Sequence, residues 1–486
     1  MHDAWPYGDL YVLEQLWARL GIAEVIAEVL GKRKLGFAVE RALFAMVANR
    51  VCAPCSKLYC YEQWLTEDVR IEGTGALQLQ HLYRAMDFLE ANKEAIEEAL
   101  YFRMADLLNL DVELIFYDTT SLHFEVDEED EGEGEADEVH GSVAARHKSY
   151  RAPRKRGKAR NGGNDAPQIV VGLAVTRDGF PVRHWVFPGN TVDVTTVEQV
   201  KRDLKGWQLT RCVFVGDAGM VSEKNLKRLA RGGGKYIVCM PVHPGGEVAT
   251  KAVNRPGRYQ EVAENLRVKE VVVGDGERRR RYAVCHNPQE AERQRQHRKH
   301  VLEELAAEIQ SLRDQQTKTH SKRVCELRAS GRYGRYIRLT RTGKPVIDQA
   351  RIKALARLDG KFVVHSNDDT LNAEDIALGY KQLQRVEEAW RSLKSGLKLR
   401  PVYHWAPHRI HAHVALTVLA LLLERVAEHA CGDTWRNFRN DLKQIKLAQL
   451  LSPNGTVWQV TEPGPRAAKR LKSLQINNPP PLLQVA

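Results

Sequence analysis

The chain has 486 residues, with 73 Lys and Arg against 62 Asp and Glu, which gives a formal net charge of +11. Such a basic balance favours an acidic partner, usually DNA or RNA, although a basic surface without a partner would give the same count. The longest apolar run, from Val414 to Leu423, is too short to span a bilayer, and no signal-peptide pattern opens the chain. We therefore expect a soluble intracellular protein with several domains and no membrane partner.

The cysteines favour neither disulfide bonds nor zinc. Eight cysteines in a chain of this length do not make a disulfide framework. Cys52, Cys55 and Cys60 form the only cluster, and no fourth ligand lies at the ordinary spacing of a zinc finger. Free thiols buried in a helical region are the better interpretation.

Residues 1–110 are predicted to form an all-α region. Apolar residues recur there at helical spacing in three groups: Leu13, Leu16, Trp17 and Leu20; Leu43, Phe44 and Val47; Ile96, Leu100 and Met104. Glycines separate the groups, at Gly31, Gly36, Gly73 and Gly75. The region either contacts DNA or covers the core as a structural cap.

Two apolar, β-prone runs each deliver one carboxylate within residues 111–230. The run from Leu114 to Ser121 carries Asp118, and the run from Cys212 to Gly219 carries Asp217. If each strand ends at its Asp, the two carboxylates can meet at one edge of a sheet although they are far apart in sequence. Hard divalent cations select such oxygen ligands.

The segment between the two Asp residues has a charged part and an ordered part. An acidic run, Glu125 to Glu138, precedes a basic run, Arg146 to Arg160. Such blocks are usually solvated and disordered, although the basic one could contact phosphates. Gln168 to Val175 and Val182 to Phe187 then predict a hairpin around the turn Arg177 to Gly179.

Helices are predicted on both sides of the Asp217 run. One extends from Asp193 to Leu204, and another opens after Ser222, a candidate N-cap. Strand, hairpin, helix, strand and helix together describe an α/β layer with a mixed sheet.

Residues 231–365 are predicted to form an insertion domain of short strands and one long charged helix. The strands are Tyr236–Met240, Val268–Val273, Tyr282–Cys285 and Tyr336–Leu339. The helix, from about Pro288 to Arg313, presents one apolar face, made of Val301, Leu302, Leu305 and Ile309. Phe362 to Val364 then marks a return to the core.

A third acid, Glu387, lies on a helix predicted from Asn372 to Gly396. An apolar stripe runs along this helix through Leu383, Val386, Trp390, Leu393 and Leu397. Tyr380, Glu387 and Lys394 recur every seventh residue and share an adjacent stripe. Glu388 is the neighbouring alternative, but it points about 100° around the helix. Trp390 could stack on an unpaired base, although packing in the core is the better interpretation.

These motifs together resemble the DDE transposases of bacterial insertion sequences, in the group with a Tyr-Arg-Glu-Lys signature and a β-rich insertion before the Glu. The similar segments are Tyr117–Ser121, Gly216–Gly219, Pro188–Thr191, the Tyr380…Glu387…Lys394 helix, Leu399–His404 and Arg409–His413. The resemblance covers most of the chain from about residue 35 to 430.

The resemblance implies an RNase H-like α/β fold, in which a mixed sheet is flanked by helices and interrupted by the insertion. Residues 111–230 would form the first part of this core and residues 366–430 the second, with the insertion at 231–365. Residues 431–486 would form a C-terminal region suited to dimerisation. The function implied is metal-dependent cleavage at transposon ends and strand transfer into target DNA, by a homodimer on double-stranded DNA with terminal inverted repeats, in the bacterial cytoplasm beside the nucleoid.

The resemblance also assigns roles to individual residues. Asp118, Asp217 and Glu387 would be the catalytic metal ligands for two Mg²⁺ ions about 4 Å apart, with Mn²⁺ as a substitute and Asp118 bridging both ions. DNA would be held by a further set of side chains: Tyr380, Arg391, Lys394, Lys398, Arg400 and His404.

Two features leave alternatives open. The signature Arg of the group corresponds to Leu383, so its phosphate contact must come from another residue, such as Arg385 or Arg391. His404, His408 and His411 approximate a metal-binding spacing, but DNA contacts or helix capping are preferred because phosphoryl transfer calls for oxygen ligands. The alternative functions are a catalytically inactive or repurposed DNA-binding derivative, and an RNase H-like nuclease without strand transfer.

Overall fold

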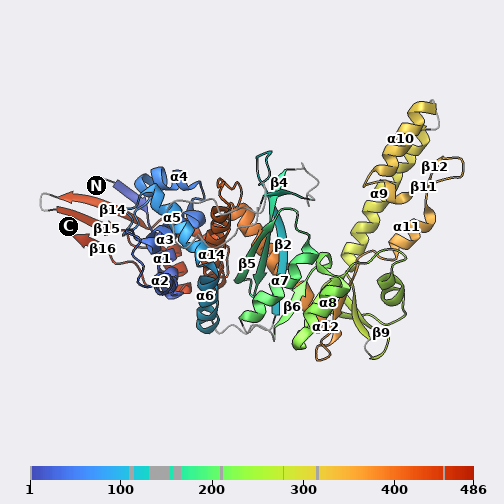
Figure 1. Cartoon of the computed structure of the whole chain (residues 1–486), viewed down its shortest axis with the longest axis horizontal. Helices are drawn as coiled ribbons and strands as arrows, with labels where there is room; N and C mark the ends of the chain where they lie inside the picture. The colour runs from blue at the N-terminus through green and yellow to red at the C-terminus, as the bar shows by residue number, and fades with distance from the viewer. Residues whose placement is uncertain are drawn as a thin grey trace. The chain divides into compact units, whose positions relative to one another are not determined.

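The computed structural model describes residues 3–108, 114–130, 154–157, 166–207, 212–276, 279–312, 317–452 and 455–485. The chain forms two compact units (Figure 1). Unit 1 contains Met1–Thr196 and Leu383–Ala486, and unit 2 contains Val197–Gln382. These limits group the chain differently from the five regions expected from the sequence, and the boundaries of those regions stay a prediction.

Unit 1 is built around helices, as expected for its N-terminal part. The helices are α1 (Gly8–Arg19), α2 (Ile22–Leu30), α3 (Val39–Cys52), α4 (Lys57–Tyr59), the π-helix η1 (Cys60–Asp68), α5 (Leu79–Ala91), α6 (Lys93–Leu107), α13 (Gln384–Arg391), the π-helix η9 (Ser392–Gly396), α14 (Pro407–Cys431), α15 (Trp435–Leu442) and α16 (Pro465–Ser473). Cys52 and Cys60 are buried free thiols, and Cys55 is half-buried.

The central helix of unit 1 is α14. It packs against α1, α3, α5 and the sheet strand β5 (Pro181–Pro188). The apolar run from Val414 to Leu423 is only the middle of this 25-residue helix. By length and composition α14 could cross a membrane, but 89% of its most apolar window is buried inside the protein, as in the core helix of a globular unit.

A second layer of unit 1 is an antiparallel sheet. Strand β4 (Pro167–Val175) pairs with β2 (Leu114–His123), β3 (Lys155–Arg156) and β5. The hairpin predicted between β4 and β5 is therefore confirmed, with Gly179 at φ +84° in its turn. Of the two charged runs, residues 131–153 and 158–165 lie outside the described residues. A smaller antiparallel sheet joins the two ends of the chain: β1 (Asp3–Pro6), β14 (Lys446–Ser452), β15 (Gly455–Val460) and β16 (Leu482–Val485).

Asp118 does not end its strand, in contrast to the expectation. It pairs with Leu173 in the middle of β2, which continues to His123. The three hydroxyl residues after Asp118 are compatible with a strand and are buried, so they continue the ladder with β4. Apolar content alone therefore misplaced the end of the strand.

Unit 2 contains a mixed sheet flanked by helices. Strand β6 (Val213–Gly216) runs parallel to β7 (Tyr236–Met240). The sheet then continues in antiparallel order through β13 (Lys361–Ser366), β10 (Arg280–His286), β9 (Leu266–Val273) and β8 (Gln260–Ala263). The helices beside it are α8 (Glu223–Ala230) and α12 (Ala373–Lys381), with the short π-helix η6 (Ala249–Val253). Helix α7 (Asp193–Gly206) spans the division between the units.

Three strands expected in a separate insertion join this sheet. β7, β9 and β10 lie within one residue or two of the predicted ranges, but they extend the same sheet as β6. Hydropathy indicates that a strand is buried and does not indicate which sheet it joins. Ser222 caps α8 as predicted, because its Oγ accepts a hydrogen bond from the Asn225 amide at 3.1 Å.

The rest of residues 288–360 packs around a small core of its own. It consists of α9 (Pro288–Leu312), α10 (Thr317–Ala329), β11 (Ile337–Leu339), β12 (Pro345–Ile347) and α11 (Gln349–Ala356). The predicted apolar face of α9 is confirmed, since Val301 and Leu305 are fully buried there and Leu302 and Ile309 pack against the same cluster. We call residues 288–360 the arm.

The helix predicted from Asn372 to Gly396 is broken. α12 ends at Lys381, and α13 starts at Gln384. Gln382 and Leu383 keep right-handed helical angles, and neither is Gly or Pro, so no breaker signal marks the interruption. The apolar stripe is nevertheless confirmed as buried: Leu383, Val386, Trp390, Leu393 and Leu397.

Candidate active site

A cavity of about 260 Å³ in unit 1 contains two of the three predicted acids. Asp118 lines it from β2, and Glu387 lines it from α13, which packs against β2. The remaining lining residues are Thr119, Thr120, Ser121, His123, Trp390 and Lys394. Carboxylates separated by 269 positions of sequence therefore face one space, with an ammonium group beside them.

The helix spacing explains why Glu387 lines this cavity. Glu387, Trp390 and Lys394 are three and four residues apart, so they share one face of the helical segment. Glu388 is not among the lining residues. Its carboxylate instead accepts hydrogen bonds from Gln384 at 3.1 Å and from Arg385 at 3.2 Å. The geometry therefore favours Glu387 over Glu388 as the third acid. Arg385 pairs with Glu388 and is not among the residues that line the cavity.

Hydrogen bonds and close packing hold β2 in position. The Thr119 hydroxyl donates to Asp193 at 2.6 Å, and the buried Tyr117 hydroxyl donates to Thr196 at 3.0 Å. The Tyr117 ring lies so close to Gly172 of β4 that a Cβ there would come within 2.6 Å of its oxygen. Only glycine at 172 leaves room for the ring, which fixes β2 against β4.

The Pro188–Thr191 motif has a structural explanation. A Cβ at Gly189 would lie 2.0 Å from the Gln168 carbonyl oxygen and 2.1 Å from that of Lys155. The side-chain amide of Gln168 also donates to the Gly189 carbonyl at 2.8 Å. The motif therefore lets the chain cross closely over the start of β4 before α7, whose first residue, Asp193, holds Thr119.

Positive charges act on His123 at the cavity. Burial lowers the pKa of His123, and the nearby positive charges of Arg400 and Lys394 lower it further. Its imidazole is therefore neutral at physiological pH. Lys394 lines the cavity with Asp118 and Glu387, and Arg400 lies close enough to His123 to act on its pKa.

Asp217, the second predicted acid, belongs to unit 2. It follows β6 directly, so its placement at a strand end is as predicted, and it is exposed. The Tyr380 hydroxyl on α12 donates to Asp217 Oδ1 at 3.1 Å. Burial raises the pKa of Tyr380 well above its usual range, and the charges of Cys239 and Asp217 add to this. The phenol therefore stays protonated and is a permanent donor to the carboxylate.

The donor set fits a hard divalent cation in chemistry. Asp118 and Glu387 offer carboxylate oxygens around one cavity, flanked by hydroxyls. Within the described ranges, no group of three His, Cys, Asp or Glu side chains is arranged to hold a metal ion. Asp118, Asp217 and Glu387 as a metal site therefore stay a prediction.

The other predicted DNA contacts lie in varied surroundings. Arg391, Lys398 and Arg400 are exposed. The buried Arg50 guanidinium donates to the carbonyl oxygens of Leu397 and Lys398 at 3.5 and 3.1 Å, which holds this segment on unit 1.

His404 is a neutral group in this structure. Burial lowers its pKa to about 3, and Lys57, Arg409 and Arg50 add to the effect. Its ring lies 6.1 Å from Tyr83 and 5.6 Å from His413. His404 therefore does not offer a positive charge to a phosphate.

The other two histidines of the predicted trio contact acids on α5. His408 lies 3.2 Å from Asp87, and His411 lies 3.4 Å from Glu90. These contacts tie the start of α14 to α5. They differ from the DNA contacts or helix capping expected from the sequence.

Some residues at the site were not predicted. His123 lies two residues after the motif ending at Ser121, and extending the strand pattern would have included it. Asp193 was noted only as the start of a helix. Outside the cavity, the buried Lys57 near His404 has no hydrogen-bond partner for its ammonium among the described residues, and no sequence signal indicated this position.

Comparison with known proteins gives the family. The chain matches the model of the transposase DDE domain over residues 143–423, which is more than half of its length. It belongs to this family. No curated protein matches it. Among solved structures it is similar to the piggyBac transposase in a cryo-electron microscopy structure of its synaptic complex with hairpin DNA, at 11% sequence identity and a TM-score of 0.35, covering 90% of this chain and 79% of that one.

Proposed function

We propose that the protein is a bacterial insertion-sequence transposase that cuts DNA at transposon ends and joins the ends to target DNA. The observation that carries this proposal is the cavity shared by Asp118, Glu387 and Lys394 in a chain of the DDE family. The net charge of +11 supports DNA as the partner. We further propose an RNase H-like core, action as a homodimer, and a location in the cytoplasm beside the nucleoid.

Asp118, Asp217 and Glu387 would hold the divalent cations, Mg²⁺ or its substitute Mn²⁺. When bound, these ions supply activation of a water or 3′-hydroxyl and neutralisation of charge on the leaving oxygen. Tyr380 orients Asp217 through its hydrogen bond. Lys394 attracts a phosphate oxygen to the cavity, and the buried Trp390 forms part of its wall.

The exposed cations Arg391, Lys398 and Arg400 would hold the DNA backbone beside the cut. His404, which we expected among these contacts, would serve through its ring and not through a charge, because burial keeps it neutral.

The test is cleavage and joining by purified protein on DNA that carries the inverted repeats flanking the gene, with Mg²⁺ or Mn²⁺. Asp118→Asn, Asp217→Asn and Glu387→Gln should each reduce cleavage at least about 10³-fold and leave DNA binding intact. Glu388→Gln is the matched control, and it should retain cleavage within a few-fold because Glu388 is engaged with Arg385.

The outcomes separate the alternatives. Cleavage at the wild-type rate by any of the three acid variants would contradict the site. DNA binding without cleavage by the wild type would indicate an inactive or repurposed derivative. Cleavage without joining of the cut ends to target DNA would indicate a nuclease that lacks strand transfer.

A further inference from the structure

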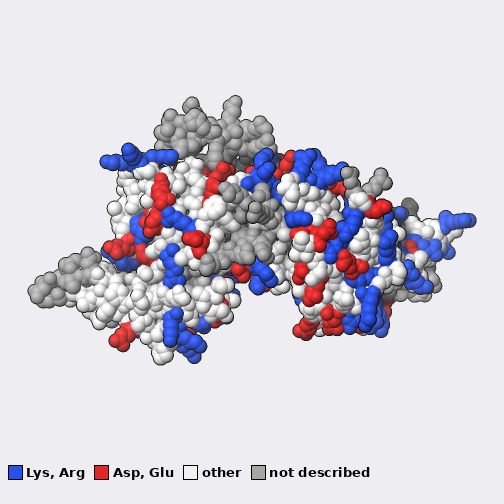
Figure 2. All heavy atoms as spheres, turned by 90° about the horizontal axis from the view of Figure 1, so that it is seen from below, with Lys and Arg blue, Asp and Glu red and all other residues white. Residues whose placement is uncertain are grey.

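The arm, like the basic run from Arg146 to Arg160, carries a large positive charge. Residues 288–360 contain 17 Lys and Arg against 9 Asp and Glu, a net charge of +8 out of +11 for the whole chain. Figure 2 shows Lys and Arg side chains crowded over unit 2, with Asp and Glu among them. The arm is therefore a source of positive potential that attracts a polyanion.

Most of the arm's acids are already paired within the arm. Glu290 pairs with Arg293 at 2.7 Å, Glu292 pairs with Arg295, and Glu308 pairs with Arg323 at 3.1 Å. Ten exposed cations form no ion pair with a described carboxylate: Lys299, Lys322, Arg328, Arg335, Arg338, Arg341, Lys344, Arg351, Lys353 and Arg357. Their charge remains available for a partner.

A basic hairpin lies at β11 and β12. The strands pair antiparallel, with Arg338 opposite Val346. The turn is closed by hydrogen bonds from the Thr340 amide to the Lys344 carbonyl at 2.9 Å and from the Gly343 amide to the Thr340 carbonyl at 3.0 Å, with Gly343 at φ +77°. Arg338, Arg341 and Lys344 are exposed on this ribbon.

The hairpin is held firmly in place. Tyr336 and Ile337, at its base, belong to the buried cluster of the arm. The Tyr336 carbonyl also accepts a hydrogen bond from the Asp348 amide at 2.8 Å, which closes the base of the ribbon. Because the backbone of this ribbon is already ordered, binding has to fix only the side chains of the three cations. A ribbon of this width fits a groove of duplex DNA.

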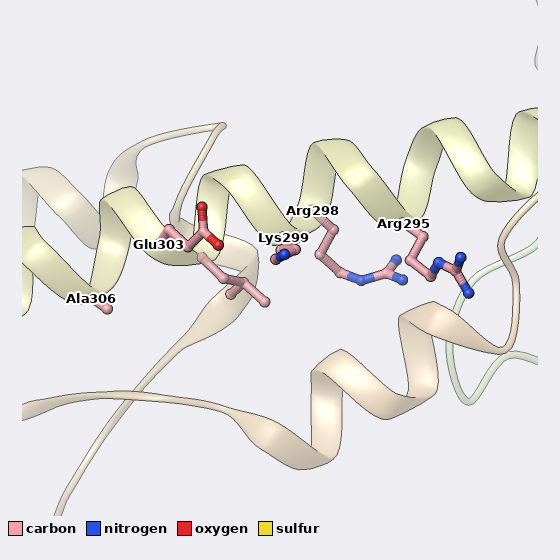
Figure 3. A pocket seen from close by; sticks show the side chains of 6 residues that line it. Arg295, Arg298, Lys299, Glu303 and Ala306 are labelled. Carbon is pink, nitrogen blue, oxygen red and sulfur yellow. The ribbon is translucent and has the colours of Figure 1, made fainter.

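A groove of about 490 Å³ lies along α9 in the same arm, and Figure 3 shows Arg295 and Arg298 projecting from one side of the helix. Arg298 donates to Asp359 at 2.7 Å and is buried, so it joins α9 to the segment after α11. Lys299 is exposed at the groove and pairs with no described acid. The groove thus adds Lys299 as a cation available to a partner, while Arg298 stabilises the arm through its hydrogen bond to Asp359.

We propose that the arm binds double-stranded DNA, with Arg338, Arg341 and Lys344 of the β11–β12 hairpin entering a groove and contacting the flanking phosphates. This inference deepens the proposed function, on which it rests, by naming a DNA-contacting surface that does not include the predicted acids. The remaining available cations of the arm strengthen the attraction without reading sequence.

The experiment measures how the affinity of the full chain for a fluorescently labelled DNA duplex of mixed sequence depends on KCl concentration, by anisotropy. In one variant Arg338, Arg341 and Lys344 are all replaced by Gln. We expect the dissociation constant to rise about 10- to 100-fold and the slope of log K against log [salt] to fall by roughly 2 to 3, about one unit for each phosphate that the hairpin no longer neutralises.

The matched control replaces Arg293, Arg295 and Arg323 by Gln. It removes the same formal charge from the same arm, at cations that already pair with carboxylates. We expect less than about a threefold change in affinity and an unchanged salt slope, with thermal melting like that of the wild type for both variants. Equal effects of the two triple variants would overturn the proposal, because they would show that only net charge matters. An unchanged affinity of the hairpin variant would overturn it as well.

Two further measurements keep the conclusions apart. Duplex RNA of the same length is titrated in parallel, and a loss confined to RNA in the hairpin variant would show that the partner is wrong. Cleavage of transposon ends by the wild type is measured separately. If the wild type cleaves normally and the hairpin variant binds DNA as tightly as the wild type, the arm inference alone is overturned. If the hairpin variant binds DNA more weakly but the wild type does not cleave, the proposed function alone is overturned.

Discussion

The hydroxyl of Tyr380 donates a hydrogen bond to the carboxylate of Asp217 over 3.1 Å, within one unit of the protein. We expected this tyrosine to hold a phosphate, side by side with Glu387 and Lys394 on one helix. The helix is interrupted along the chain between Tyr380 and those two residues, and the phenol of Tyr380 donates to the second acid. The three residues of the Tyr…Glu…Lys spacing therefore make different contacts. Tyr380 contacts Asp217, whereas Glu387 and Lys394 line the cavity with Asp118.

Tyr380→Phe should impair catalysis more than stability. The change removes the donor that orients Asp217, so we expect cleavage to fall roughly tenfold and the Mg²⁺ concentration for half-maximal rate to rise. Because Asp217 is exposed, the free energy of unfolding should change by less than about 1 kcal/mol. Tyr236→Phe is the control, since it removes a buried hydroxyl that contacts His365 at 3.0 Å and not Asp217. A similar loss of cleavage in both variants would contradict an orienting role.

Leu383→Arg, which restores the signature Arg of the group, should destabilise the protein. Leu383 is 7% exposed, and a guanidinium at this position would be desolvated without a partner. We expect the free energy of unfolding to fall by about 2–4 kcal/mol, measured by urea denaturation. The adjacent exposed change, Gln384→Arg, should stay within about 0.5 kcal/mol. A free energy of unfolding equal to that of the wild type, together with faster cleavage by Leu383→Arg, would show instead that the protein accepts the signature Arg at this position.

Local patterns predicted much of the fold. The β4–β5 hairpin, α9, β7 and the cap of α8 all follow from short-range signals: alternation around a glycine turn, an apolar stripe, and a Ser before a helix. The interruption of the helix at Gln382 and Leu383 could not be predicted from the sequence. Neither residue is Gly or Pro, both keep helical angles, and the apolar stripe continues across them. Asp118 was placed at a strand end because the pattern turns polar after it, yet Thr119 and its neighbours continue the ladder with β4.

The candidate site was predictable as a set of residue types and not as a place. Strand-borne Asp residues and a helical Glu indicated metal chemistry, which stays a prediction, while the structure places Asp118 and Glu387 around one cavity. The roles of Asp193 and Gly172 in supporting β2 depend on contacts between distant strands and helices, which periodicity does not report. The neutral state of His404 likewise depends on its burial beside Lys57 and Arg409.

Glu424 should make the stability of the protein depend on pH. Burial raises its pKa to about 7, and the nearby Glu428 charge adds to the rise. The folded state therefore binds more protons than the unfolded state between about pH 4.5 and 7, so stability present below pH 4.5 is lost as the pH rises to 7. Glu424→Gln removes this loss.

We expect the free energy of unfolding of Glu424→Gln, relative to that of the wild type, to rise by on the order of 3 kcal/mol between pH 4.5 and 8. Glu62→Gln, at an exposed position of the same unit, should show no such trend. Parallel pH profiles of wild type and Glu424→Gln in urea denaturation would refute the assignment.

Gly189→Ala should destabilise unit 1 sharply. The new methyl group would meet the carbonyl oxygens of Gln168 and Lys155 at about 2 Å, and backbone atoms at the start of β4 cannot move aside as a side chain can. We expect a loss of about 3 kcal/mol in the free energy of unfolding, measured by urea denaturation. Gly206→Ala is the control, because no atom lies within 4 Å of its would-be Cβ. Equal melting of the two variants would show that the close crossing at Gly189 can relax.

The core of unit 1 is completed by α14, which is synthesised after the whole of unit 2. Helices α3 and α5 leave the ribosome well before α14, which packs against both, and the whole of unit 2 is synthesised in the interval. Domains fold as units during synthesis, so unit 2 can be complete while the apolar faces of α3 and α5 are still uncovered. A chain cut short before Pro407 would therefore carry an intact unit 2 with Asp217, beside a partner unit open to proteolysis. Unit 1 thus resists proteolysis only after translation has reached the end of α14.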